Sequence, residues 1–294
     1  MAATKASTAK AAATKAATLL EATEISRGLW YGDPGKGKTF DIAHMAKLGK
    51  VIYIDAERRL KKGPLVRAGV PIGNIEPFID VSYKSLIQLA MDITERLADG
   101  EDIVGLCWDS GTETHRIFLE GLVDSAVIKA ANQGKERDPW STYREDYGDM
   151  TEQMRRVLRR FRDLPIHLAI AALAKREDDE EGKVRVSPAF TPAVLRDVMG
   201  YMDVVFHKRM ELVEGKEEYS GLSKPIGRFE AKDSYGVFPR VLVDPTFDRV
   251  LKYIEGDLTG DKDPIQIEAR AARLRQQQDA PTETASAPAE ADTE

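Results

Sequence analysis

The octapeptide Gly32–Thr39, with the sequence GDPGKGKT, constrains the fold of this 294-residue chain more than any other feature. It matches the pattern G-x-x-x-x-G-K-[ST], and it lies between the apolar run Gly28–Tyr31 and a segment with helical spacing. Its glycines let the backbone curl until successive N–H groups point at phosphate oxygens, and the start of the next helix adds a positive dipole end. The pattern therefore predicts a nucleotide phosphate loop between a strand and a helix. The predicted nucleotide-binding residues are Gly32, Asp33, Pro34, Gly35, Lys36, Gly37, Lys38, Thr39 and Phe40.

Two residues of this loop are expected to do the chemistry of the phosphate site. The pattern predicts that Lys38 reaches the β- and γ-phosphates and that the hydroxyl of Thr39 ligates Mg²⁺. A loop of this kind also needs an acid at the end of a neighbouring strand to hold the metal. The apolar run Ile103–Trp108 supplies it, because Asp109 follows directly. ATP with Mg²⁺ is therefore the expected ligand. Lys36 is not fixed by the pattern, and a lysine at such a position is more often merely solvated.

A further acidic pair follows the apolar run Val51–Ile54, where the chain reads Asp55, Ala56, Glu57. A carboxylate at this position can polarise the water that attacks a γ-phosphate, so Glu57 is the candidate general base. The same three residues also fit the simple capping of a strand end. From these residues alone both interpretations stay open.

The chain alternates short apolar runs with segments of helical spacing, which is typical of an α/β fold with a mostly parallel sheet between helices. The predicted strands are Gly28–Tyr31, Val51–Ile54, Ile75–Ile79, Ile103–Trp108 and Ile166–Leu173. The predicted helices are Lys38–Leu48, Tyr83–Leu97, Glu113–Ala131 and Tyr147–Phe161. After about residue 200, antiparallel strands at one edge of the sheet and a final helix are predicted, at Met202–Glu214, Tyr219–Lys232, Val241–Val243 and Phe247–Glu255.

Composition divides the chain into a domain at residues 23–256 and two tails. Residues 1–22 are rich in Ala, Thr and Lys and predict a disordered arm. Residues 257–294 predict a disordered acidic tail, with a short helix at 265–278. Ten acidic and four basic residues from Glu255 onward account for the whole net charge of −6, so the rest of the chain is close to neutral.

Cysteine content and hydropathy exclude several classes of protein. A single cysteine excludes a disulfide framework and a multi-thiolate metal site. No apolar run approaches the roughly 18 residues of a membrane span. We therefore expect a cytoplasmic protein without a membrane partner.

The order of these motifs resembles the ATPase core of the RecA family over about residues 25–255. The residues that carry the resemblance are the phosphate loop, the run YIDAERRL that begins at Tyr53, and the apolar run that ends in Asp109 and Ser110. In that family the glutamate of the same I-D-A-E run is the catalytic base, which implies this role for Glu57.

Within this family the chain is similar to the phage RecA-core ATPases, which work with single-strand-annealing or single-strand-binding proteins. The compact size, Tyr147 with Gly148, and the segment Phe229–Pro239 carry this finer resemblance. It implies action on single-stranded DNA, in the host cytoplasm if the chain is phage-encoded. It also implies a homo-oligomer, ring or filament, with nucleotide at the subunit interface and an annealing or ssDNA-binding protein as a possible partner.

Two features bear on how such a family member would complete its site. The segment AKDSYG, which begins at Ala231, is similar to the A-K-x-R-x-G stretch of hexameric replicative helicases, whose Lys and Arg reach the neighbouring subunit's γ-phosphate. Lys232 matches the lysine and Ser234 replaces the arginine, so the resemblance implies a catalytic role for Lys232 alone. A solvated strand lysine fits Lys232 equally well. The family's phosphate-sensing glutamine is also replaced, because the sequence reads LAKR from Leu173.

Two loops correspond to the DNA-contacting loops of RecA-like proteins. The first, Gly134–Tyr147, mixes cations with aromatic rings, which suits phosphate contact and base stacking, although a lid packed on the sheet fits it as well. Its candidate DNA-binding residues are Lys135, Arg137, Trp140, Tyr143 and Arg144. The second, Arg176–Phe190, carries five consecutive acids that repel phosphates. Five arginines on the outer face of Met150–Arg162 either line a DNA channel, pair with an acidic neighbouring subunit, or form a solvated face.

The leading hypothesis is therefore a Mg²⁺-dependent ATPase that acts on single-stranded DNA in phage recombination or annealing, with hydrolysis stimulated by DNA. A ring helicase motor of the DnaB class is one alternative, supported by the AKDSYG segment. A nucleotide-gated adaptor with little hydrolysis is another. A small-molecule kinase is disfavoured, because Glu57 and the β-rich C-terminal edge match a hydrolytic core better.

Overall fold

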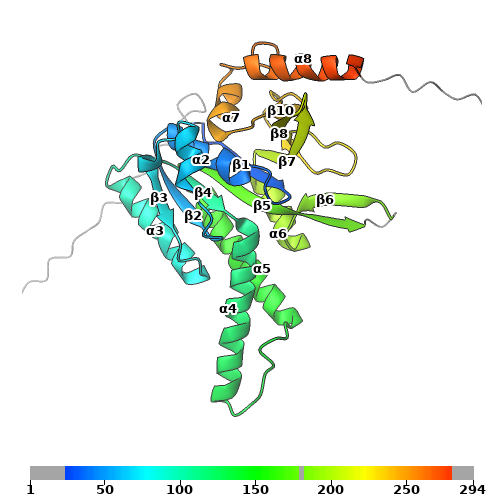
Figure 1. The fold of residues 1–294 in the computed structure, drawn as a ribbon. Helices are drawn as coiled ribbons and strands as arrows, with labels where there is room; N and C mark the ends of the chain where they lie inside the picture. Colours follow the sequence, from blue (N-terminus) through cyan, green and yellow to red (C-terminus); the bar gives the residue numbers. More distant parts are fainter. Residues whose placement is uncertain (1–23, 179–181, 280–294) are drawn as a thin grey trace, which may run out of the picture.

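A computed structural model describes residues 24–178 and 182–279 of the chain. In these residues a ten-stranded, mostly parallel sheet lies between helices on both faces (Figure 1), which confirms the predicted fold class. The strands are β1 (Arg27–Gly32), β2 (Lys50–Asp55), β3 (Ile75–Phe78), β4 (Ile103–Asp109), β5 (His167–Asp178), β6 (Val184–Pro188), β7 (Val204–Val213), β8 (Lys216–Leu222), β9 (Lys232–Asp233) and β10 (Val241–Val243). Their order across the sheet is β10-β8-β7-β1-β5-β4-β2-β3, with β6 paired to β5 and β9 to β7.

The helices cover the two faces in two sets. They are α1 (Lys38–Ala43), α2 (Lys62–Arg67), α3 (Tyr83–Ala98), α4 (Gly111–Asn132), α5 (Arg144–Arg162), α6 (Pro192–Tyr201), α7 (Phe247–Ile254) and α8 (Pro264–Asp279), with 3-10 turns η1 (His44–Lys47) and η2 (Ile72–Asn74). Apolar residues of α3, α5 and α6 pack with Leu29 and Tyr31 on one face of β1. Those of α1, η1, α2 and α7 pack with Trp30 on the other face. This alternation along β1 is expected for a strand buried on both sides.

The parallel core brings the predicted site residues to one edge of the sheet. Strands β7, β1, β5, β4, β2 and β3 pair in parallel, so their carboxyl ends lie on the same side. The loops that follow β1, β2 and β4 therefore meet. The prediction that Asp109 ends a strand next to the phosphate-loop strand is wrong, because β5 lies between β1 and β4.

The C-terminal part of the sheet differs from the prediction in two strands. Strands β8 and β10 are antiparallel to their neighbours, as predicted, but the predicted strand Tyr219–Lys232 is divided, because β8 ends at Leu222 and β9 begins at Lys232. Strand β7 pairs in parallel with β1 and is the sixth strand of the main parallel core. The physical reason is α6, which precedes β7 and provides the crossover connection that a parallel strand requires.

The helix α8 confirms the short helix that the sequence predicts at 265–278. It extends over Pro264–Asp279 and packs against β10 and β7, so the predicted disorder does not apply to these residues. The side chain of Gln266 bonds the backbone of Val241 and Val243, and Arg273 pairs with Glu218. The predicted arm and residues 280–294 of the predicted tail lie outside the described residues.

The helices α4 and α5 form a hairpin, and its far end, made by the distal half of α4 and the connection to α5, projects away from the sheet (Figure 1). All five buried residues of α4 lie between Gly111 and Val123, so none lies in its last nine residues. The connection to α5 is at the far tip of this hairpin. Among the described residues, no helix is both long enough and apolar enough to cross a bilayer.

Candidate nucleotide-binding site

The phosphate loop has the backbone that its glycines make possible. Gly35 and Gly37 adopt φ of 76° and 79°, in the left-handed region that side chains disfavour. Gly37 is the N-cap of α1. A Cβ on Gly32 would lie 2.6 Å from the backbone oxygen of Lys208 on β7, so only glycine fits where the loop leaves the sheet. The loop therefore curls between β1 and α1 as the sequence predicted.

The ammonium of Lys38 lies inside this curl. Its Nζ donates hydrogen bonds to the backbone oxygens of Gly32 at 2.9 Å and Asp33 at 2.8 Å. Burial lowers the pKa of Lys38 from its ordinary value, and the charges of Asp109 and Glu57 act in the opposite direction. A cation held at the concave side of the loop, next to two acids, is placed to bind terminal phosphates.

The two predicted metal ligands, Thr39 and Asp109, are hydrogen-bonded to each other at the edge of the sheet. The Thr39 hydroxyl donates a hydrogen bond to Asp109 Oδ2 at 2.6 Å, and the Tyr53 hydroxyl donates to the same oxygen at 2.9 Å. Asp109 is buried, and burial raises its pKa to about 6. Tyr53 is not among the predicted site residues, because a tyrosine in an apolar strand has the same sequence pattern as an ordinary core residue.

These donors fit Mg²⁺. Hydroxyl and carboxylate oxygens are the ligands that this cation prefers, and it is commonly held by one or two carboxylates together with substrate phosphates. Thr39 and Asp109 supply one of each within hydrogen-bond distance. A bound cation would also favour the ionised form of the buried Asp109 carboxyl. Among the described residues no larger cluster of His, Cys, Asp and Glu could hold a metal.

The acidic pair after β2 divides into two different roles. Asp55 is buried, and its carboxylate accepts the backbone N–H groups of Arg59 and Leu60, so it caps the turn. Glu57 is held instead by side chains, because Ser110 Oγ donates to its Oε1 at 2.8 Å. The guanidinium of Arg59 lies 3.6 Å from the other carboxylate oxygen. The capping interpretation therefore applies to Asp55, and the carboxylate of Glu57 is available at the cavity.

Ser110 was not among the predicted site residues, although it directly follows Asp109. Its hydroxyl oxygen accepts the backbone N–H of Glu113 and so caps the start of α4. At the same time its hydroxyl donates to Glu57. One side chain thus ties the end of β4 to the candidate base on the β2 side, where Ala56 N also bonds Asp109 O at 2.7 Å.

A cavity of about 870 Å³ joins these groups. The phosphate loop from Pro34 onward lines it, as do Glu57 and Asp109. Lys36 and Phe40, two further predicted nucleotide contacts, also face it. Tyr219 on β8 and Asp244 before α7 close the side nearest α1, and Tyr219 Cδ1 lies 3.4 Å from where a Cβ on Gly37 would be. Both come from a part of the chain in which no sequence motif marks them.

A buried ion pair lies next to the phosphate loop, between α1 and β7. Lys208 Nζ lies 2.6 Å from Asp41 Oδ2, and neither side chain is more than 4% exposed. Burial raises the pKa of Asp41 despite this partner. Because Asp41 is on α1 and Lys208 is on β7 beside Gly32, the pair links the helix that follows the loop to the strand next to the loop.

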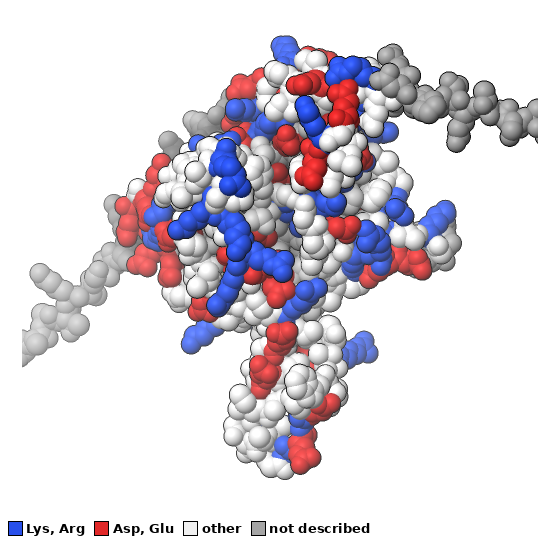
Figure 2. Space-filling view, viewed as in Figure 1, with Lys and Arg blue, Asp and Glu red and all other residues white. Residues whose placement is uncertain are grey.

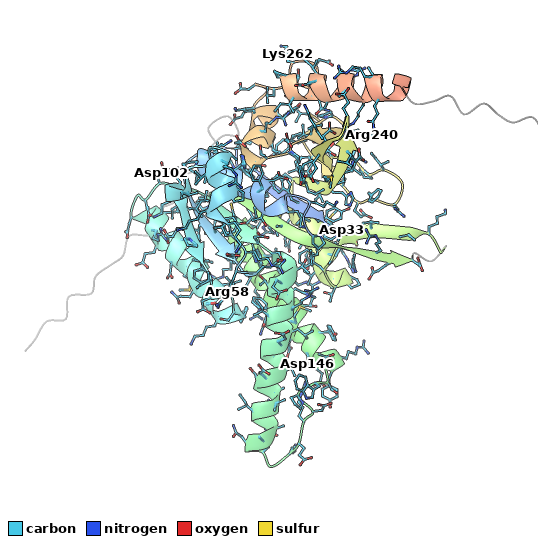
Figure 3. All side chains as sticks on the ribbon, in the orientation of Figure 1. Asp33, Arg58, Asp102, Asp146, Arg240 and Lys262 are labelled. Atoms are coloured by element: carbon cyan, nitrogen blue, oxygen red, sulfur yellow. The ribbon has the colours of Figure 1, made fainter. Side chains whose placement is uncertain are left out.

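At the position where RecA-family proteins carry a phosphate-sensing glutamine, this chain has an apolar residue. Leu173, level with Gly32 in the sheet, lines the cavity. Of the two cations that follow it, Lys175 pairs with Glu177 at 2.8 Å. Arg176 pairs with Asp33 of the phosphate loop, also at 2.8 Å (Figure 3, in which Asp33 is labelled). Arg176 therefore contacts the loop itself.

Lys232 does not come to the phosphate loop of its own chain. Its Nζ donates to the backbone oxygens of Met199 at 3.1 Å and Met202 at 2.6 Å, at the end of α6. Strand β9 pairs with the start of β7, which is the edge of the sheet opposite the loop. A role for Lys232 on a neighbouring subunit stays a prediction, and it requires the ammonium to leave these carbonyls.

The five candidate DNA-binding residues gather at the tip of the α4–α5 hairpin, far from the cavity. Trp140 is 92% exposed, so it is not packed on the sheet as a lid would be. Arg137 is held within the chain, because its guanidinium pairs with Asp146 and lies 4.5 Å over the ring of Tyr143. Lys135 and Arg144 are exposed, but the segment 134–147 contains three basic and four acidic residues. DNA binding here stays a prediction.

The arginines of α5 are largely occupied. Arg155 pairs with Asp197, Arg156 with Glu152, and Arg162 with Asp163. These contacts indicate a solvated and partly bridged helix face rather than an open channel lining. The single cysteine, Cys107, is buried in the core, where burial raises its pKa well above the ordinary value.

Comparison with known proteins assigns the chain to a family. The AAA_24 family, an AAA domain, matches residues 25–235, well over half of the chain. A search of curated proteins gives no match. Solved structures that match include the flagellar accessory protein FlaH from Methanocaldococcus jannaschii, with 9% sequence identity, a TM-score of 0.42, and coverage of 74% of this chain and 84% of that chain. With the phosphate loop in place, residues 25–235 form a P-loop NTPase core, and the chain belongs to the AAA_24 family of AAA domains.

Proposed function

We propose that the chain is a Mg²⁺-dependent ATPase of the RecA-like class that acts on single-stranded DNA. The observation that carries the proposal is the convergence of Lys38, Asp109 and Glu57, from three separate strand ends, on one cavity. Lys38 supplies a phosphate-binding cation and Asp109 a metal-binding carboxylate. Glu57 supplies a second carboxylate, which is held by side chains and not by backbone N–H groups.

Each residue then has a distinct task. Lys38 and the loop N–H groups bind the phosphates, and Thr39 with Asp109 would hold Mg²⁺. Bound Mg²⁺ would neutralise charge on the phosphate oxygens. Glu57, oriented by Ser110, accepts the proton of the attacking water as general base. Most of the rate enhancement should come from these fixed charges rather than from covalent chemistry.

Two observations favour slow hydrolysis by the isolated chain. Arg59 lies beside the Glu57 carboxylate and competes with water for it. Leu173 offers no polar group to the terminal phosphate at the sensor position. Stimulation by DNA or by a neighbouring subunit is therefore expected. We propose a homo-oligomer with the nucleotide near its interface, working beside an annealing or single-strand-binding protein in phage recombination.

The test is a phosphate-release assay with ATP, with and without Mg²⁺ and single-stranded DNA. Mg²⁺-dependent release that rises with DNA supports the proposal. Tight ATP binding with no release under any condition would instead identify a nucleotide-gated adaptor. Unwinding of a forked duplex by a defined hexamer would identify a helicase of the DnaB class, a reading that the bonded state of Lys232 disfavours.

A further inference from the structure

A run of basic residues follows Glu57 directly, at the mouth of the nucleotide cavity. Five cations lie within ten residues, and no acidic residue occurs between Glu57 and Glu76. The exposed cations of the run are Arg58, Arg59, Lys61, Lys62 and Arg67. On the molecular surface, Lys and Arg side chains gather on the face between α2 and the base of α4 (Figure 2). We call residues 58–62 the basic segment.

Most of this charge is not neutralised within the chain. Among the described residues, Arg58, Lys61 and Lys62 form no ion pair or side-chain hydrogen bond, and Arg59 has only the 3.6 Å contact with Glu57. The arginines of α5 are different, because three of its six arginines pair with carboxylates of the same chain. Clustered like charges repel one another, so an unpaired cluster on a nearly neutral domain is suited to an external polyanion.

A second hollow lies beside the basic segment. It has a volume of about 460 Å³ and is lined by Arg58, Ile79, Asp80, Val81 and Ile117. The side chain of Ile79 is 54% exposed there. Arg58 has a φ of 54°, and the turn that positions it is closed by the Arg58 N to Asp55 O hydrogen bond. Arg58, labelled in Figure 3, thus belongs to this hollow, whereas Arg59 and Lys61 line the nucleotide cavity.

We propose that the basic segment binds the phosphodiester backbone of a single-stranded nucleic acid, with an unpaired base in the hollow beside Arg58. Cations along a groove and an apolar surface for a base are the two elements of single-strand recognition. A duplex would keep its bases stacked and out of the hollow. The hairpin tip predicted from the sequence has balanced charge, so the basic segment is the stronger site for phosphates.

The position of Arg59 couples this site to the nucleotide. A phosphate on the basic segment attracts the guanidinium of Arg59 away from Glu57, which leaves the carboxylate to water. This coupling rests on the proposed function of Glu57, whereas the binding site itself does not. DNA binding and DNA stimulation are therefore measured separately.

The binding test compares variants of the nucleotide-free protein on a fluorescein-labelled oligothymidylate. Arg58→Asn with Lys62→Gln removes two cations outside the nucleotide cavity, and asparagine tolerates the left-handed backbone of residue 58. This variant should bind at least about tenfold more weakly, with a salt slope reduced by about 0.7 per lost phosphate contact. A matched control, Lys84→Gln with Lys129→Gln, removes two exposed lysines elsewhere and should bind like the wild type.

Three results would overturn the site. In the first, the Arg58/Lys62 variant binds the oligothymidylate as tightly as the wild type, whereas Trp140→Ala and Arg144→Gln bind it more weakly. This result would place the DNA-binding site at the hairpin tip. Another is unchanged DNA affinity with a smaller oligomer by light scattering, which would make the segment a contact for a second copy. The third is no DNA binding by the wild type.

The coupling test uses Arg59→Gln in the phosphate-release assay. It should raise basal hydrolysis and bring the ratio of DNA-stimulated to basal rate close to one. A basal rate and a stimulation ratio equal to those of the wild type would overturn the coupling while leaving the binding result intact. Failure of the proposed function is recognisable separately, because the wild type would then release no phosphate.

Discussion

The hydroxyl of Thr39 donates a 2.6 Å hydrogen bond to Asp109, although the strands that lead to these residues are separated by β5. The contact is possible because Thr39 lies in the first turn of α1, beyond the end of β1, where the helix passes over the carboxyl edge of the sheet. It keeps the hydroxyl and the carboxylate together at the place where Mg²⁺ would bind.

This arrangement has a stability consequence that can be measured. Burial raises the pKa of Asp109 to about 6, compared with 3.8 for a free aspartate. The folded protein therefore binds this proton more tightly than the unfolded chain, and stability from this group is lost as the pH rises from about 4 through 6. Asp109→Asn should raise the free energy of unfolding at pH 7.5 by about 1–3 kcal/mol in metal-free buffer, with a smaller difference at pH 4. Urea titrations at the two pH values measure it.

The same variant should lose its response to magnesium. Wild-type protein with ATP is expected to gain thermal stability when Mg²⁺ is added, because the cation favours the ionised carboxylate. Asp109→Asn should show little of this gain. A variant that is less stable than the wild type at pH 7.5, or that responds fully to Mg²⁺, would contradict the assignment of Asp109.

Ser110 is expected to act on hydrolysis through Glu57. Ser110→Ala removes the 2.8 Å hydrogen bond that orients the carboxylate and also the N-cap of α4. We expect kcat to fall by about tenfold with KM nearly unchanged, and stability to fall by about 1 kcal/mol. Ser110→Thr keeps the hydroxyl and should recover most of the rate. Equal kcat in Ser110→Ala and the wild type would show that the contact does not position Glu57.

The buried pair of Lys208 and Asp41 should behave as a unit. Lys208→Met leaves the carboxylate buried without its partner, which costs about 3–5 kcal/mol in such pairs. Because burial raises the pKa of Asp41, the lone carboxyl is protonated more readily at low pH, so the loss should be smaller at pH 5 than at pH 8. Lys208→Met combined with Asp41→Asn should recover much of the stability. Additive losses in the double variant, measured by urea unfolding, would show that the two residues are independent.

Because α8 docks on the domain, two truncated chains should differ clearly in thermal stability. Asp263 pairs with the buried guanidinium of Arg249 and accepts a hydrogen bond from Tyr253 at 2.7 Å. A chain that ends at Gly256 loses this carboxylate and leaves the edge strand β10 uncovered, so it should unfold at lower temperature and aggregate. A chain that ends at Asp279 keeps both. Calorimetry with light scattering compares them, and equal melting temperatures would remove α8 from the folded domain.

The parts of the site that the sequence predicted are those with a motif. The glycines and Lys38 have a fixed spacing, because the loop backbone itself binds phosphate. Asp109 and Glu57 each follow a clearly apolar strand, so their positions at strand ends could be recognised. For Asp109 the neighbouring strand was misassigned, since strand order depends on pairings between distant segments that spacing does not encode.

The remaining features depend on tertiary contacts. Lys208 lies in a strand that contains both polar and apolar residues. Its contact with Asp41 on α1 is apparent only from the three-dimensional structure. A helix is predicted at 265–278, but its docking on the domain is not, because the docking depends on contacts of Gln266 and Arg273 with distant residues and on the burial of Ala269 and Ala272. The basic segment is visible in the sequence, but its lack of partners and its position beside two hollows are not.

A single-turnover experiment with Glu57→Gln tests the central assignment most directly. Labelled ATP and Mg²⁺ are mixed with an excess of protein, and bound ATP and released phosphate are followed in the same sample. We expect Glu57→Gln to bind ATP within about threefold of the wild type and to hydrolyse it about 10²–10⁴ times more slowly, because the general base is lost. Hydrolysis by Glu57→Gln at the wild-type rate would contradict the assignment of Glu57 as the general base.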